Sequence, residues 1–308
     1  MRCEDALGAI GNTPIVRLKG LEPEGGAEIW VKLEGGNPTG SYKDRMAASV
    51  LRRAMDRGAL RRGDRVVEYT GGSTGTALAF VSAVLGLRFT AVFSDAFSDS
   101  KRQAMEAFGA EVLIEPSGDG TITPGLIARM KARAHALAAE PGSFYADQFG
   151  SPDVRAGYDP MGREIAADLD GRVDVLLAAV GTGAALMGAA DGLAAAGVWP
   201  RIVALEPLQS PLLTTGTGGA HRVEGIGVGF APPFLDRDRL DDIRAIDQDR
   251  AFAMCRQLAR QTGLFCGGST GLNVVAAIDL ARGLEPGQRV VTLGCDTGAK
   301  YLGGHIFG

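Results

Sequence analysis

The chain has 308 residues, 45% of them hydrophobic and 22% charged, which is enough to bury a large core. Its 45 glycines follow no triplet period, so the composition excludes collagen-like and disordered chains. The 32 basic and 36 acidic residues are interspersed and leave a net charge of −4. This balance offers no basic surface for nucleic acid or anionic lipid, and we expect neither as a partner.

The cysteine usage indicates a reduced protein. The four cysteines are widely spaced and only three histidines accompany them, so no metal-site pattern arises and we predict no metal: Cys3, Cys255, Cys266 and Cys295. Glu4 and Asp5 precede any apolar run, unlike the basic start of a signal peptide. The longest uncharged apolar run, 175–190, is shorter than the roughly 18 residues of a membrane span. We therefore expect a cytoplasmic protein without a membrane partner.

Short β-branched runs alternate along the chain with longer Ala/Leu/Met patterns at helical spacing. The predicted strands are Ile29–Leu33, Arg65–Tyr69, Phe89–Phe93, Glu111–Ile114, Val173–Val180, Ile202–Leu205 and Arg289–Leu293. The predicted helices are Lys43–Gly58, Thr76–Leu85, Ser100–Phe108, Leu126–Ala139, Gly162–Leu169, Leu186–Ala196, Asp249–Thr262 and Leu272–Ala281. This order predicts an α/β fold. The polar stretch Phe144–Gly157 suggests a seam between two lobes, each a largely parallel sheet flanked by helices, and Thr214–Gly219 suggests a surface loop.

Two glycine-rich stretches follow predicted strands and precede helices, where α/β proteins bind ligands. Thr70-Gly71-Gly72-Ser73-Thr74-Gly75 can hold a carboxylate or phosphate on its backbone amides, or it can be only a tight turn. Gly181-Thr182-Gly183-Ala184-Ala185 offers the same chemistry. It is not a dinucleotide fingerprint, since Leu186 occupies the third glycine position, and no P-loop lysine follows.

Two further stretches open helices. Lys43, in Ser41-Tyr42-Lys43-Asp44-Arg45, lies against the helix macrodipole and beside Arg45, two effects that favour a neutral, nucleophilic amine. An ordinary solvated lysine is the alternative. Ser269, in Cys266-Gly267-Gly268-Ser269-Thr270-Gly271, can contact a ligand or merely cap the helix that follows.

Together and in order, these stretches resemble the cysteine synthase and cystathionine β-synthase family, the fold type II pyridoxal phosphate enzymes, whose fold is like that of the tryptophan synthase β subunit. Nine matching motifs span nearly the whole chain: Ile10–Pro14, Ser41–Arg45, Thr70–Gly75, Gln148-Phe149, Gly181–Ala185, Glu206-Pro207, Gly225–Phe230, Gly267–Gly271 and Asp296–Gly298. The resemblance implies a large cofactor-binding domain of residues 1–40 and 148–308, a small mobile substrate domain of residues 41–147, and a homodimer.

The resemblance also implies a role for each matching residue. Lys43 would be the Schiff-base lysine and would move the Cα proton. The substrate α-carboxylate would lie among residues of the first loop and two distant positions: Thr70, Gly71, Gly72, Ser73, Thr74, Gln148 and Gly225. Pyridoxal 5'-phosphate would contact Lys43 and Ser73, its phosphate would be held by Gly181, Thr182, Gly183, Ala184 and Ala185, and its pyridine nitrogen would meet Ser269.

Two positions depart from the family pattern. Most relatives have asparagine where this chain has Ser73, and the shorter side chain weakens that contact to cofactor and substrate or leaves it to water. The phosphate loop usually ends in threonine, so Ala185 removes a hydrogen bond to a charged group worth roughly 1.5–3 kcal/mol. We expect cofactor binding to persist through backbone donors. Substrate choice is the property that these departures put in question.

A neutral hydroxyl at Ser269 makes the cofactor a weaker electron sink than a carboxylate would, which favours elimination at Cβ. We therefore expect a transferase that performs β-replacement on an activated L-serine, such as O-acetylserine, through an aminoacrylate intermediate. Sulfide is the expected nucleophile, which would make this an enzyme of cysteine biosynthesis. The alternatives are a non-sulfide nucleophile in a specialised pathway, a lyase-type α,β-elimination, and a catalytically inactive binding module.

Overall fold

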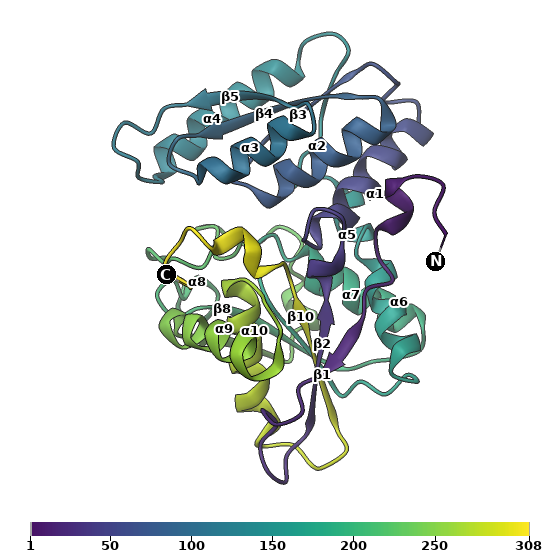
Figure 1. The fold of residues 1–308 in the computed structure, drawn as a ribbon, viewed down its shortest axis with the longest axis vertical. Helices are drawn as coiled ribbons and strands as arrows, with labels where there is room; N and C mark the ends of the chain where they lie inside the picture. The colour runs from purple at the N-terminus through teal and green to yellow at the C-terminus, as the bar shows by residue number, and fades with distance from the viewer. Residues whose placement is uncertain (1, 308) are drawn as a thin grey trace. The chain divides into compact units, whose positions relative to one another are not determined.

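The computed structural model describes residues 2–307, which form two compact units (Figure 1). The first unit contains the described residues through 10 together with 43–157, and the second contains 11–42 and the residues from 158 onward. Residues 2–10 and 148–157 therefore cluster with the unit predicted as 41–147. The packing explains the later segment, because Arg57 forms an ion pair with Asp153 at 2.7 Å and Ser49 Oγ donates to the Asp153 carbonyl oxygen at 2.8 Å.

The first unit is built on a four-stranded parallel sheet in the order β5-β4-β3-β6. Its strands are β3 (Arg65–Tyr69), β4 (Arg88–Ser94), β5 (Glu111–Glu115) and β6 (Ser143–Tyr145). Its helices are η1 (Ala6–Ala9), α1 (Lys43–Asp56), α2 (Ser73–Leu85), α3 (Asp99–Ala107), α4 (Pro124–Ala138) and α5 (Pro152–Ala156). Apolar residues of α4 pack on Val67, Tyr69 and Val92 and form a core on that side of the sheet.

The second unit contains a six-stranded sheet in the order β1-β2-β10-β7-β8-β9. Its strands are β1 (Ile15–Arg17), β2 (Glu28–Leu33), β7 (Val175–Ala179), β8 (Arg201–Pro207), β9 (Asp242–Ile246) and β10 (Arg289–Gly294), and only β1 runs antiparallel to its neighbour. Its helices are η2 (Glu34–Gly36), α6 (Asp159–Asp168), α7 (Ala184–Ala195), α8 (Leu212–Thr215), η3 (Arg237–Arg239), α9 (Gln248–Thr262), α10 (Gly268–Ala281) and η4 (Gly298–Tyr301). Every residue of β7 is buried, as expected for a strand covered on both faces.

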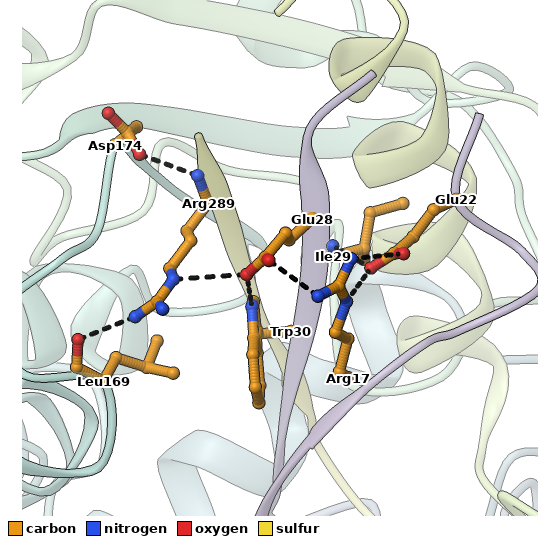
Figure 2. A network of polar contacts seen from close by, with 8 residues as sticks. All are labelled: Arg17, Glu22, Glu28, Ile29, Trp30, Leu169, Asp174 and Arg289. Atoms are coloured by element: carbon orange, nitrogen blue, oxygen red, sulfur yellow. Dashed lines mark hydrogen bonds and ion pairs between the residues drawn. The ribbon is translucent and has the colours of Figure 1, made fainter. Parts of the chain in front are cut away.

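A polar network fixes the strand register at the N-terminal edge of the second sheet (Figure 2). Glu28 begins β2 and accepts hydrogen bonds from Arg17 at 2.6 Å, Trp30 at 3.0 Å and Arg289 at 3.2 Å. Arg289 begins β10, and its backbone amide donates to Asp174 at 2.7 Å. These contacts lie at the opposite end of the strands from the glycine-rich loops, so they brace the sheet without occupying its carboxyl edge.

All seven predicted strands and eight predicted helices are present, with differences at their ends. Within residues 2–307, three strands, β1, β6 and β9, two short α-helices, α5 and α8, and the four 3-10 helices η1 to η4 were not predicted. Helices α2, α7 and α10 begin at Ser73, Ala184 and Gly268, before their predicted starts at Thr76, Leu186 and Leu272. The glycine-rich stretches therefore form the first turns of helices. Among residues 2–307, no helix is long and apolar enough to cross a membrane.

Candidate functional site

Lys43 is the first residue of α1, as predicted, and is partly buried. The residues before it are tied to the chain after β10, since Thr297 N donates to Gly40 O at 3.0 Å and Tyr42 N donates to Cys295 O at 3.1 Å. The boundary between the two units falls between Tyr42 and Lys43. Lys43 therefore begins α1 directly after Tyr42, whose backbone amide is hydrogen-bonded to the residue that follows β10.

The stretch Thr70–Gly75 links β3 directly to α2. Thr70 Oγ1 accepts hydrogen bonds from Gly72 N and Gly75 N, both at 3.1 Å, and so closes the stretch into a compact loop. The amides of Gly71 and Thr74 have no acceptor within the part of the chain that the structure describes. Two open donors at a helix N-terminus suit a carboxylate.

Gln148 lies against this loop although 74 residues separate it from Thr74. Thr74 Oγ1 donates to Gln148 Oε1 at 2.8 Å, and Gln148 Nε2 donates to Tyr69 O at 3.0 Å. The structure thus brings together, within the first unit, the loop and the glutamine to which the sequence assigns the substrate carboxylate. Ser73 occupies the first position of α2 in the same loop.

The stretch Gly181–Ala185 follows β7, and its Gly183 precedes the first residue of α7. Gly183 has φ +85°, a left-handed conformation that glycine tolerates best. Thr182 Oγ1 accepts from Ala184 N at 3.2 Å, whereas the amides of Gly183, Ala185 and Leu186 have no acceptor among residues 2–307. The loop therefore presents three free backbone donors and the positive end of a helix dipole, which is a phosphate-binding arrangement.

Gly225 also lies beside this loop. A side chain on Gly181 would collide with the Gly225 carbonyl oxygen, and Gly227 N donates to Val180 O at 3.1 Å. His221 Nε2 and the Gly227 carbonyl oxygen are 3.0 Å apart. The Gly225–Phe230 motif is thereby fixed at the carboxyl end of β7.

Ser269 is buried in the first turn of α10 and does not cap it, since Gly267 is the N-cap and no side chain caps that end. Its hydroxyl has no hydrogen-bond partner among the described residues, which leaves it available to a ligand. Asn273, one turn later, accepts from Ala179 N at 2.7 Å and donates to Leu293 O at 2.8 Å. Asn273 therefore holds the start of α10 at the carboxyl ends of β7 and β10.

A family model described as pyridoxal-phosphate dependent enzyme matches residues 6–296. The chain is 36% identical over 295 residues to a cysteine synthase of Staphylococcus aureus, covering 95% of this chain and 93% of that protein. The chain belongs to the pyridoxal-phosphate-dependent enzyme family. A second relative of this family, the O-ureido-L-serine synthase of Streptomyces lavendulae, is 37% identical over 303 residues, covering 98% and 91% of the two chains.

The solved structure of a cysteine synthase from Entamoeba histolytica superposes with a TM-score of 0.92 at 32% identity, covering 100% of this chain and 91% of that one. The predicted fold type, the enzyme class and the pyridoxal phosphate cofactor are thereby confirmed. In this pyridoxal-phosphate-dependent enzyme, the free amides of Gly183, Ala185 and Leu186 and the unpartnered Ser269 hydroxyl fit the two polar ends of the cofactor, its phosphate and its ring nitrogen.

Residues that act through other residues are not apparent from the sequence. Asn273 and Glu68 are buried polar side chains, and each contacts a backbone amide distant in sequence, that of Ala179 and that of Gln148. An asparagine one helical turn after the serine of a glycine-rich motif is a signal that could have pointed to Asn273.

Proposed function

We propose that this chain catalyses β-replacement on an activated L-serine, with O-acetylserine as donor and sulfide as nucleophile, so that cysteine is the product. One observation carries the proposal, the combination of four features in one chain. Two helix N-termini have free amides, one after β3 and one after β7. A lysine begins α1, and Ser269 has a neutral hydroxyl with no partner among residues 2–307. The family, and the cysteine synthases among its members, support this combination.

Some of the proposed site residues would bind the cofactor and others the substrate. The loop 181–185 and Ser269 would hold pyridoxal 5'-phosphate, which when bound supplies an electron-withdrawing ring for reactions at the amino acid Cα and Cβ. Thr70–Gly75 and Gln148 would bind and orient the substrate carboxylate through backbone amides and the Gln148 side chain. Lys43 Nζ would take the Cα proton and return it.

Ser269 shapes the choice of reaction in this proposal. Its hydroxyl is neutral, so it does not favour a positive charge on a ring nitrogen as a carboxylate would. A less electron-demanding ring favours departure of a Cβ leaving group over reactions that need a long-lived Cα anion. β-Replacement therefore fits Ser269 better than transamination or racemisation.

A second candidate is β-replacement with a non-sulfide nucleophile. The O-ureido-L-serine synthase of Streptomyces lavendulae matches this chain as closely as the cysteine synthase does, at 37% identity. Ser73, where family members usually carry asparagine, lies in the loop proposed to hold the amino acid. Both observations favour a substrate or nucleophile that differs from those of a standard cysteine synthase.

One competition experiment distinguishes the two candidate reactions. The cofactor-loaded protein is given O-acetylserine with sulfide, with hydroxyurea, and with both, and cysteine and O-ureido-L-serine are quantified. A higher kcat/KM with sulfide supports cysteine synthesis, and a higher value with hydroxyurea supports the second candidate. Absence of both products, with O-acetylserine intact, contradicts β-replacement on O-acetylserine. Borohydride reduction and peptide mapping should place the pyridoxyl group on Lys43, and an adduct on Lys32 or Lys300 would contradict the site.

We also propose that the protein is a cytoplasmic homodimer of the cysteine biosynthesis pathway. The family resemblance and the burial of Cys255, Cys266 and Cys295 as free thiols support this proposal. Light scattering should give twice the 32.0 kDa chain mass at micromolar concentration. A mass near that of one chain would contradict the dimer.

A further inference from the structure

Glu68, the fourth residue of β3, carries a buried carboxyl group to which the proposed function gives no role. Its side chain is fully buried, and its two oxygens accept hydrogen bonds from two different backbone amides. Oε1 accepts from Tyr69 N at 3.0 Å, and Oε2 accepts from Gln148 N at 2.9 Å. A buried acid is tolerated when its oxygens are satisfied in this way, so both contacts belong to one arrangement.

The Glu68 carboxyl group lies where the pairing between β3 and β6 ends. Val67 is paired with Tyr145, the last residue of β6, and Ala146 N donates to Val67 O at 3.1 Å. Two residues later, Gln148 N donates to the Glu68 side chain and not to a strand carbonyl. The carboxyl group thus continues the connection between β3 and residues 146–148 beyond the end of the strand pairing.

The backbone just before Gln148 is in an uncommon conformation. Asp147 has φ +51°, in the left-handed region that residues other than glycine seldom adopt. Its carbonyl oxygen accepts hydrogen bonds from Gly150 N at 3.1 Å and Ser151 N at 2.9 Å. Such a conformation persists only when surrounding contacts hold it, and Glu68 supplies the contact on the Gln148 side.

The conformation held by Glu68 determines where the Gln148 side chain points. That side chain accepts from Thr74 Oγ1 and donates to Tyr69 O, so it connects the end of β3 with the first turn of α2. The loop Thr70–Gly75 is therefore held at Thr74 by a glutamine whose backbone Glu68 anchors. Glu68 itself lies two residues before Thr70, the first residue of the loop.

We propose that Glu68 is a positioning residue that fixes Gln148, and through it the loop Thr70–Gly75, in the geometry that receives the substrate carboxylate. This inference rests on the proposed function, because it takes the loop and Gln148 as the carboxylate site.

The charge state of Glu68 agrees with that role. Burial raises the pKa of Glu68 to about 8, against the opposing effect of the two amide hydrogen bonds and with a further rise from Asp147. The other titratable groups nearby are Tyr69 and Tyr145, whose pKa values burial also raises, and His135, whose ring lies 4.7 Å from that of Tyr145. Glu68 is therefore mainly neutral at pH 7 and places no negative charge beside a loop that binds an anion.

The test compares Glu68→Gln and Glu68→Leu with the wild-type protein, all loaded with pyridoxal phosphate. Glutamine has the shape of the neutral acid but replaces one acceptor oxygen with a donor, and leucine removes both acceptors. Glu111→Gln is the matched control, because Glu111 lies in the same sheet and, among residues 2–307, its side chain accepts a hydrogen bond from Thr90 Oγ1 alone, at 2.9 Å. The measurements are cofactor content, KM and kcat with O-acetylserine and sulfide, and amide hydrogen exchange at Gln148 and Thr74.

We expect the KM for O-acetylserine to rise roughly 10- to 100-fold in Glu68→Leu, the range that small misplacements of a binding group cause, and less in Glu68→Gln. Cofactor content should stay unchanged, kcat should fall less than KM rises, and exchange at Gln148 and Thr74 should accelerate. The Glu111→Gln control should match wild type in each measurement. If Glu68→Leu does not fold, Glu68→Gln carries the same comparison.

An unchanged KM in a folded Glu68 variant whose Gln148 amide has lost protection would overturn the positioning role. A different result would contradict the proposed function alone: wild-type protein that never consumes O-acetylserine. In that case exchange still decides the inference, since unchanged protection at Thr74 in Glu68→Leu would show that Glu68 does not hold the loop.

Discussion

Three hydroxyl groups of the proposed site are engaged in different ways. Thr70 Oγ1 accepts two amides of its own loop, and Thr182 Oγ1 accepts one amide of the next helix. Ser269 has no partner among residues 2–307. Thr70 and Thr182 therefore shape the loops that contain them, whereas the Ser269 hydroxyl remains for a ligand.

Replacing Ser269 tests this difference. Ser269→Ala should leave cofactor content nearly unchanged, because the free amides of Gly183, Ala185 and Leu186 remain, and should lower kcat about 2- to 10-fold, as expected for one hydrogen bond of about 0.5–1.5 kcal/mol. Ser269→Asp should shift the cofactor absorbance toward a protonated ring and lower kcat further. Unchanged spectra and rates in both variants would show that Ser269 does not contact the cofactor.

Glu68 should make the stability of the protein depend on pH. Its pKa rises from 4.5 in the unfolded chain to about 8 in the fold, so the folded state keeps a proton that the unfolded state loses above pH 4.5. The stabilisation that the protonated Glu68 carboxyl group contributes is fully present below pH 4.5 and is lost as the pH rises toward 8. This loss lowers the free energy of unfolding by at most about 5 kcal/mol. Urea unfolding of wild type should show this decline.

Glu68→Gln is the control for that decline, since its side chain does not titrate. The difference in unfolding free energy between the variant and wild type should shift in favour of the variant between pH 5 and pH 8. Parallel pH dependences of the two proteins would contradict the raised pKa of Glu68.

At the scale of elements, the sequence predicted which helices follow which strands but not where three of them begin. In α2, α7 and α10 apolar residues recur at helical spacing only from Thr76, Leu186 and Leu272 onward. The Gly, Ser and Thr residues before these positions are typical of loops. These residues nevertheless form the first helical turns. A first turn has free amides whatever its side chains are, so propensity does not reveal it.

Other features depend on contacts between distant residues. Gln148 meets Glu68 across 80 residues of sequence, and Asn273 meets Ala179 across 94. Strand β6 has only three residues, too few to show an alternating pattern. The loop chemistry was therefore predictable from local sequence, whereas the groups that hold the loops in place were not.

The loop after β3 leaves no room for a side chain at Gly71. A Cβ atom there would lie 2.7 Å from Phe97 Cε1 and 2.9 Å from Cζ, and Phe97 packs on Phe93 with ring centroids 5.3 Å apart. Gly71→Ala should therefore displace the Phe97 ring, lower the free energy of unfolding by about 1–3 kcal/mol and raise the KM for the amino acid. Urea unfolding and initial-rate kinetics measure both effects.

A smaller side chain at position 97 should relieve the crowding. The double variant Gly71→Ala, Phe97→Leu should recover part of the stability that Gly71→Ala loses, which a double-mutant cycle quantifies. Gly125→Ala is the matched control in the same unit, since its Cβ meets only Thr123 Oγ1 at 3.8 Å. Additive losses in the cycle would show that Phe97 does not limit the space at Gly71.

At the scale of the whole molecule, each of the two compact units contains residues to which the proposed function gives a role. Lys43 begins the first unit's main segment, and the loop 181–185 and Ser269 belong to the second. Each unit has its own sheet, so each can be stabilised separately. A ligand that binds only folded protein stabilises the unit that contacts it, and attachment at Lys43 should extend that effect to the first unit.

Lys43→Ala separates the two contributions. In wild type, pyridoxal phosphate should slow amide hydrogen exchange at 181–186, at the start of α10 and in the first turn of α1. In Lys43→Ala, the slowing should remain at 181–186 and α10, because the phosphate and Ser269 contacts survive, and should vanish from α1. Lys131→Ala, which removes an exposed lysine of α4, should behave as wild type. Equal slowing in α1 with and without the Lys43 amine would contradict the attachment, and no slowing at 181–186 in wild type would contradict the phosphate loop.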